Sequence, residues 1–109
     1  MAEYQRIHAN QAKKMLDSDK KIILLDVRTA EEYEQKHIPG AKLIPNEVIN
    51  DHTTKEISKD NTILVYCRSG NRSRQATEKL LKLGYTDVYD FGGINEWSYE
   101  IEGGAYKRE

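Results

Sequence analysis

Two short apolar runs constrain the fold of this chain more than any other feature. They are Ile22-Ile23-Leu24-Leu25 and Ile63-Leu64-Val65-Tyr66. Each run is rich in strand-forming residues and bounded by polar ones, which predicts strands buried on both faces, as in a parallel sheet. Weaker strand candidates lie at residues 4–8, 42–44 and 87–89.

Helical patterns fall between these runs. Asn10 can cap a helix with one apolar face. Thr29 and Glu32 form a capping box that opens a second helix, which we expect to reach residue 35. A longer helix is expected to begin at Ser73 and to stop at Gly84. Because strands alternate with helices, the chain is predicted to form a three-layer α/β domain with a mostly parallel sheet.

The length of 109 residues favours a single domain spanning residues 1–109. A polar loop is expected at residues 51–60, and a last short helix at residues 94–97, after a pair of glycines that turns the chain into it. In sheets of this kind, ligands bind beyond the carboxyl ends of the strands. The residue that follows the better of the two apolar strands therefore marks the expected site.

Composition excludes several classes of function. Hydrophobic residues make up 38% and charged residues 32%, which is typical of a soluble globular chain, and the net charge of −1 gives no general attraction to nucleic acid or acidic membranes. No apolar run approaches the roughly 18 residues of a membrane helix, and the N-terminus has no apolar signal core. A single cysteine cannot form an internal disulfide, which favours a reducing cytoplasm. Lys20-Lys21 and Lys107-Arg108-Glu109 are predicted to be solvated charge.

That cysteine stands directly after the strand ending at Tyr66. It opens the segment Cys67-Arg68-Ser69-Gly70-Asn71-Arg72-Ser73, which leads into the longer helix. The start of a helix carries partial positive charge and unpaired N–H groups. Gly70 and Asn71 tolerate the unusual backbone angles that let successive amides turn inward around an anion. The segment is therefore predicted to form an amide cradle around the cysteine sulfur.

A reactive, anionic Cys67 is the expected result. A free cysteine has a pKa of about 8.5, so only a few per cent is thiolate at neutral pH, and both helix N-termini and neighbouring cations lower that value. The alternative is an inert cysteine buried at the end of a core strand. Basic and turn-forming residues follow Cys67 where that alternative would favour apolar ones.

The three arginines near the cysteine have different expected roles. Arg72 lies inside the loop, where its guanidinium can either bind substrate or brace the loop, and both roles remain open. Arg68 follows the cysteine directly and is expected to point outward, toward a charged substrate. Arg74 falls in the first helical turn and is expected to face solvent.

Residues near the other strand end are expected to support the site. Asp26 and Arg28 are predicted to hold the loops through buried hydrogen bonds and an ion pair, in preference to acting as an acid and a substrate clamp. His37 is predicted to order its loop by hydrogen bonding and not to act as a base. The three scattered histidines and one cysteine offer no metal-ligand spacing.

Three segments of the chain resemble the signatures of the rhodanese family, in the family's order and spacing. The first holds Asp26-Val27-Arg28, Glu31-Glu32-Tyr33 and His37-Ile38-Pro39-Gly40-Ala41, the second runs from Tyr66 to Ser73, and the third is Phe91-Gly92-Gly93-Ile94 with Trp97. Any one of these motifs is a weak signal, whereas the three together are specific.

The resemblance implies a five-stranded parallel sheet flanked by helices, and no cofactor. It also implies that Cys67 takes the outer sulfur of thiosulfate or a similar persulfide donor and passes it to a thiophilic acceptor such as cyanide, a small thiol or a protein cysteine. The substrate would be held by the loop residues Arg68, Ser69, Gly70, Asn71, Arg72 and Ser73.

Two other classes of function remain as alternatives. Cysteine phosphatases and arsenate reductases of related fold place an arginine six residues after the cysteine, whereas Arg72 comes five after Cys67 and Ser73 takes the sixth position. The shorter loop should fit a sulfur atom better than a phosphate group. A non-turnover interaction module, or a sulfur carrier serving one partner protein, is the second alternative, and the sequence does not separate a carrier from a free enzyme.

Overall fold

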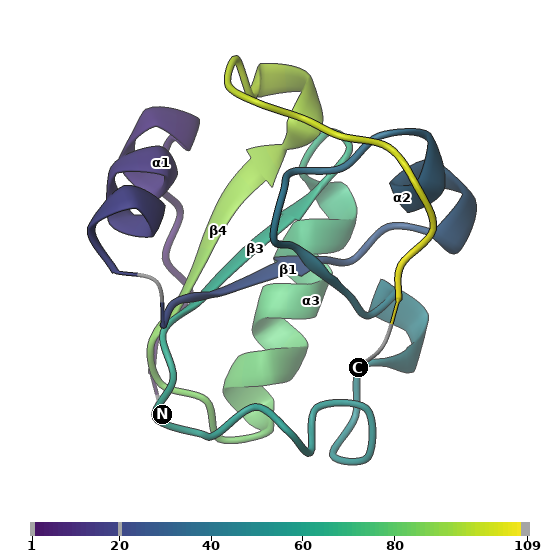
Figure 1. The fold of residues 1–109 in the computed structure, drawn as a ribbon. Coiled ribbons are helices and arrows are strands. Elements are labelled where there is room, and N and C mark those ends of the chain that lie inside the picture. Colours follow the sequence, from purple (N-terminus) through teal and green to yellow (C-terminus); the bar gives the residue numbers. More distant parts are fainter. Residues whose placement is uncertain (1, 20, 108–109) are drawn as a thin grey trace.

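The structure, a computed structural model, describes residues 2–19 and 21–107. Lys20, Arg108 and Glu109, for which solvated charge is predicted, lie outside the described residues, as does Met1. Four strands form one sheet in the order β2-β1-β3-β4, and every neighbouring pair is parallel (Figure 1). The strands are β1 (Ile23–Asp26), β2 (Lys42–Leu43), β3 (Ile63–Cys67) and β4 (Val88–Gly93).

The prediction of a fifth strand at residues 4–8 is wrong. This segment makes only one parallel bridge, between Arg6 and Asp90 on the outer side of β4. Two backbone hydrogen bonds hold the bridge: Asp90 N–H donates to Gln5 at 3.0 Å, and Ile7 N–H donates to Asp90 at 2.9 Å. The segment leaves the sheet after Arg6 because the first helix begins only three residues later, at Ala9.

Three α-helices and two single 3₁₀ turns surround the sheet. They are α1 (Ala9–Ser18), α2 (Ala30–Gln35), α3 (Asn71–Lys82), η1 (Asn46–Val48) and η2 (Ile94–Glu96). The capping box of α2 is confirmed, since Thr29 Oγ1 accepts from the Glu32 amide at 3.1 Å. The predicted cap of α1 is wrong by two positions, because His8 and not Asn10 precedes its first residue. None of the helices in the described ranges is long and apolar enough to cross a membrane.

Helix α3 begins at Asn71, two residues before the predicted start. Gly70 precedes it with φ +118°, a left-handed conformation that turns the chain directly from the loop into the helix. Asn71 is already helical, so of these two residues only Gly70 adopts the unusual backbone angles. The predicted stop is confirmed: Gly84 follows the helix with φ +105°.

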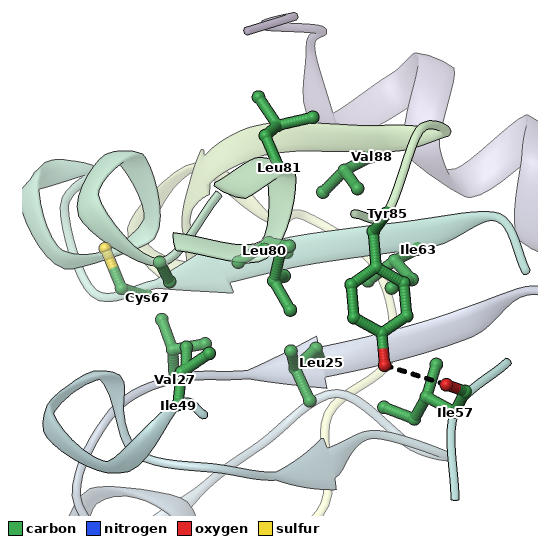
Figure 2. Close-up of a cluster of buried hydrophobic side chains, with 12 residues drawn as sticks. Leu25, Val27, Ile49, Ile57, Ile63, Cys67, Leu80, Leu81, Tyr85 and Val88 are labelled. Carbon is green, nitrogen blue, oxygen red and sulfur yellow. Dashed lines mark hydrogen bonds between the residues drawn. The ribbon is translucent and has the colours of Figure 1, made fainter. Parts of the chain in front are cut away.

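The core lies on both faces of the sheet, as the two apolar runs predict. Leu25, Ile63 and Val65 pack with the buried face of α3, whereas Leu24, Leu64 and Tyr66 pack with side chains of α1, α2 and η2. Alternate residues of one strand therefore enter different layers, which confirms the three-layer arrangement. Figure 2 shows the α3 layer, in which the Tyr85 hydroxyl donates to the Ile57 carbonyl at 2.7 Å and Cys67 lies at the edge of the cluster.

Candidate active site

Cys67 is the last residue of β3, at the carboxyl end of an inner strand. Its side chain is 1% exposed, and its sulfur accepts a hydrogen bond from the Gly70 amide at 3.0 Å. Among the described residues this is the one hydrogen bond recorded to Sγ. Arg68 and Ser69 are exposed between these two buried residues, so the loop arches over the sulfur and returns to it at Gly70.

The end of β4 forms the floor beneath this loop. Cys67 pairs with Gly93 across an irregularity in the β3–β4 register. A Cβ atom built on Gly93 would lie 1.9 Å from the Arg68 carbonyl oxygen and 2.7 Å from Ser69 Cα. Only glycine fits here, because the loop backbone occupies the space of a side chain. The glycine pair thus ends β4 as well as leading into η2, a role that the expectation of a simple turn missed.

Ser73 fastens the loop to β4 from inside. Its side chain is fully buried, and Ser73 Oγ lies 3.1 Å from the Gly70 carbonyl oxygen and 3.4 Å from that of Gly92. The hydroxyl therefore bridges the two segments that meet beside Cys67. The structure brings Ser73 to the site, with its donor already committed to the protein backbone.

Arg72 reaches across to α2. Its guanidinium donates to both carboxylate oxygens of Glu32, at 2.6 and 3.0 Å. The hydrogen bond from Arg72 is the main cause that lowers the pKa of Glu32 from 4.5 to about 2. The same bond is the main cause that raises the pKa of Arg72. Of the two roles left open for Arg72, the geometry shows the bracing contact.

The other two arginines contact solvent. Arg68 is exposed. The Arg74 side chain is 61% exposed, and its guanidinium carbon lies 4.4 Å from the centre of the Tyr4 ring. Its nearest carboxylate, on Glu78, is 3.7 Å away.

Asp26 and Arg28 form a buried ion pair with a nitrogen–oxygen distance of 2.7 Å. Arg28 Nη2 also donates to the Lys36 carbonyl at 2.7 Å. Tyr66 completes the network: its hydroxyl donates to Asp26 at 2.7 Å and accepts from the Ile38 amide at 3.1 Å. Burial is the main cause that raises the pKa of Tyr66, so the hydroxyl stays protonated. The network joins the ends of β1 and β3 to the segment that follows α2.

Sequence reasoning missed Tyr66 and the second role of Glu32. Tyr66 reads only as the last apolar residue of a strand, and Glu32 reads as half of a capping box. Each contact is made with a residue at least 28 positions away, Ile38 for Tyr66 and Arg72 for Glu32. No local pattern carries such a signal.

His37 is buried against Tyr33. The two rings stack with centroids 3.6 Å apart and planes 7° apart. His37 Nδ1 lies 2.7 Å from the Tyr33 carbonyl oxygen, and Nε2 lies 3.1 Å from a Glu102 carboxylate oxygen. These recorded hydrogen bonds tie the end of α2 to the C-terminal segment and do not involve the loop after Cys67.

Two cavities of the protein lie away from this loop. One, of about 750 Å³, lies between β2 and the C-terminal segment, and the other, of about 350 Å³, lies between α1 and Trp97. No residue of 67–73 lines either of them. Over residues 2–19 and 21–107, no cluster of three His, Cys, Asp or Glu side chains is placed to hold a metal ion. The cradle at Cys67 is thus separate from both of these cavities.

The chain is similar in sequence to known proteins. The chain is 38% identical over 73 residues to the thiosulfate sulfurtransferase PspE of Escherichia coli, covering 66% of this chain and 70% of PspE. It is 36% identical over 106 residues to UBA4 of Meyerozyma guilliermondii, named an adenylyltransferase and sulfurtransferase, covering 90% of this chain but only 24% of UBA4. The chain thus spans about a quarter of the length of relatives such as UBA4.

Solved structures agree with these sequence relatives. A crystal structure of a rhodanese-like domain protein from Staphylococcus aureus superposes with a TM-score of 0.81 at 31% identity, over 93% of this chain and 99% of the other. Residues 8–100 match the family described as the rhodanese-like domain. The chain therefore belongs to the rhodanese-like family.

Proposed function

We propose that the chain is a sulfurtransferase in which Cys67 carries sulfane sulfur as a persulfide. The proposal depends on one hydrogen bond: the Gly70 amide donates to the sulfur of Cys67, the chain's one cysteine, at 3.0 Å. Gly70 directly precedes the twelve-residue helix α3. An N–H group and a helix N-terminus both stabilise negative charge on sulfur. In a persulfide the negative charge lies on the outer sulfur, which is bonded to Sγ, and we expect the nearby N-terminus of α3 to stabilise it.

The proposed reaction has two steps. The Cys67 thiolate attacks the outer sulfur of thiosulfate, the sulfur–sulfur bond of the donor breaks, and its electron pair leaves with sulfite. Cyanide, a thiol or a protein cysteine then attacks the terminal sulfur of the Cys67 persulfide and restores the thiolate. Because residues 1–109 hold no second cysteine, we expect the acceptor to be a separate molecule or a second subunit. A thiol of this kind suits a reducing compartment such as the cytoplasm.

The position of Arg72 favours sulfur over phosphate as the group transferred. A phosphatase needs a guanidinium on the oxyanion held over its cysteine, whereas Arg72 donates to both oxygens of Glu32. The nearly complete burial of Cys67 suits a single sulfur atom better than a tetrahedral group. Phosphate-ester hydrolysis therefore serves as the competing outcome of the test.

The relatives support sulfur transfer in two forms. PspE is named a thiosulfate sulfurtransferase, which supports thiosulfate as a donor for a free enzyme. UBA4 is a much longer protein named for two activities, which supports a unit that delivers sulfur within a larger system. Both forms use the same persulfide, and they differ in whether the acceptor is a small molecule or one particular protein.

A donor panel tests the proposal. The protein is incubated with thiosulfate, glutathione persulfide or polysulfide, each with cyanide, and thiocyanate is measured; p-nitrophenyl phosphate is tested in parallel. We expect thiocyanate above the protein-free rate with at least one donor, none above that rate with Cys67→Ser, and no phosphate release. Phosphate release without thiocyanate from any donor would contradict the proposal.

A further inference from the structure

We propose that Arg6 is a positioning residue that holds the Gly70 amide on the Cys67 sulfur. Its kinetic consequence rests on the proposed function, although its structural consequence does not. Arg6 belongs to the N-terminal segment, and its one bridge, to Asp90, fixes its backbone beside β4, two residues before Gly92. That bridge brings a residue from the start of the chain to the loop after β3.

The guanidinium of Arg6 occupies the place of a side chain on Gly92. A Cβ atom built on Gly92 would lie 2.5 Å from Nη2 and 3.2 Å from Cζ of Arg6. A Cβ on Gly70 would lie 3.7 and 3.8 Å from the two terminal nitrogens, and 3.9 Å from Gly92 Cα. Gly70 and Gly92 therefore approach each other closely, and the guanidinium covers the point where they meet.

Ser73 holds the same two glycines by their backbone. Its hydroxyl contacts the carbonyl oxygens of Gly70 and Gly92, as described above. Ser73 is fully buried, whereas Arg6 is exposed, so one residue acts from within the protein and the other from its surface. Together they set the position of Gly70, whose amide is the recorded donor to the Cys67 sulfur.

A buried carboxylate anchors the surroundings of Arg6. Asp90 is fully buried, accepts from the Tyr4 hydroxyl at 2.6 Å and accepts from the Gly92 amide at 2.8 Å. Although burial opposes its charge, the pKa of Arg6 is raised by the nearby Tyr4 hydroxyl and by the carboxylates of Asp90 and Glu96. Arg6 is thus held as a cation, next to the glycines, by a framework that includes the Gly92 amide itself.

Loss of this side chain would free one surface of Gly70 while leaving the core intact. The Gly70 N–H would then donate to Cys67 Sγ for less of the time. The negative charge that develops on Sγ during sulfur transfer would be less stabilised as a result. An interaction that acts mainly in the transition state affects kcat and leaves KM largely unchanged. A guanidinium that bound the donor directly would instead raise KM.

The test compares Arg6→Ala, Arg6→Lys and the control Lys13→Ala, which removes one positive charge from the surface of α1. Hydrogen exchange of the Gly70 amide is followed by NMR, and kcat and KM are measured with thiosulfate and cyanide. For Arg6→Ala we expect Gly70 exchange to rise and kcat to fall about three- to fivefold, with KM within about twofold of the parent value. Arg6→Lys should recover part of both effects, and Lys13→Ala should change neither.

Unchanged Gly70 exchange in Arg6→Ala, or a raised KM at unchanged kcat, would overturn the proposal. A general loss of protection throughout β3 in Arg6→Ala would also overturn it, because that result would make Arg6 a residue of overall stability. The exchange measurement needs no sulfur transfer. It therefore decides the role of Arg6 even if no donor loads Cys67, a result that would count against the proposed function alone.

Discussion

Removing the contact between Arg72 and Glu32 tests how the loop after Cys67 is held in place. We consider Glu32→Gln, because glutamine can still serve as the partner of Thr29 in a capping box and so keeps α2 capped. The substitution removes the charge that Arg72 binds and little else. Its neighbour Glu31 lies in the same helical turn and forms no ion pair with any residue of 2–19 or 21–107, so Glu31→Gln is the matched control for net charge.

The pKa of Glu32 gives the size of the effect. It falls from 4.5 to about 2, and at about 1.4 kcal/mol per unit this difference of about 2.5 sets an upper limit of about 3 kcal/mol. Thr29 also contributes to the shift, and the Arg72 and Glu32 side chains are 30% and 27% exposed, so water screens the pair. We therefore expect Glu32→Gln to lower the free energy of unfolding by about 1–2 kcal/mol at pH 7.

The effect should depend on pH in one direction. Because folding lowers the pKa of this carboxyl group, its stabilisation is complete above about pH 4.5 and is lost as the pH falls toward about 2. Urea denaturation of the parent, Glu32→Gln and Glu31→Gln proteins at pH 7 and near pH 2 measures this. The deficit of Glu32→Gln should nearly vanish at the lower pH. A deficit that stays constant with pH, or equals that of Glu31→Gln, would refute the reasoning.

Three further predictions concern the site and its floor. Arg72→Ala should lower kcat/KM for thiosulfate roughly tenfold and Arg74→Ala less than about twofold, because Arg72 braces the loop and Arg74 does not; equal small effects would contradict this. Gly93→Ala should lower the free energy of unfolding by at least about 2 kcal/mol in urea denaturation, since its methyl group meets loop backbone, and an unchanged midpoint would disprove that close approach. Tyr66→Phe should reduce stability by about 1–3 kcal/mol in the same assay, because it removes one buried donor to Asp26 and the acceptor of the Ile38 amide; a loss below about 0.5 kcal/mol would count against the network.

The position of Cys67 could be predicted from the sequence because it depends on local pattern. An apolar run gave β3, and chain order alone placed Cys67 at its carboxyl end. The capping box of α2 and the glycine that stops α3 are similarly local signals, each carried by residues a few positions apart. Features of this kind depend on backbone conformations that neighbouring residues determine.

The contacts that hold the loop could not be predicted in this way. Arg72 and Glu32 are 40 positions apart, and Gly93 meets Arg68 only because β3 and β4 are neighbours in the sheet. The failure of the fifth-strand prediction at residues 4–8 also has a tertiary cause. Its residues have strand-like composition, but the early start of α1 leaves room for only the Arg6 bridge. These features are determined by tertiary packing and not by the local propensity of the residues.

Intact-mass spectrometry tests the central claim most directly. The protein is incubated with each sulfur donor and separated from small molecules, and its intact mass is measured before and after addition of cyanide. We predict a gain of one sulfur atom that depends on Cys67 and disappears with cyanide, while Cys67→Ser gains none. A protein whose mass never changes with any donor, or whose added sulfur persists in the presence of cyanide, would contradict a persulfide held in the Gly70 cradle.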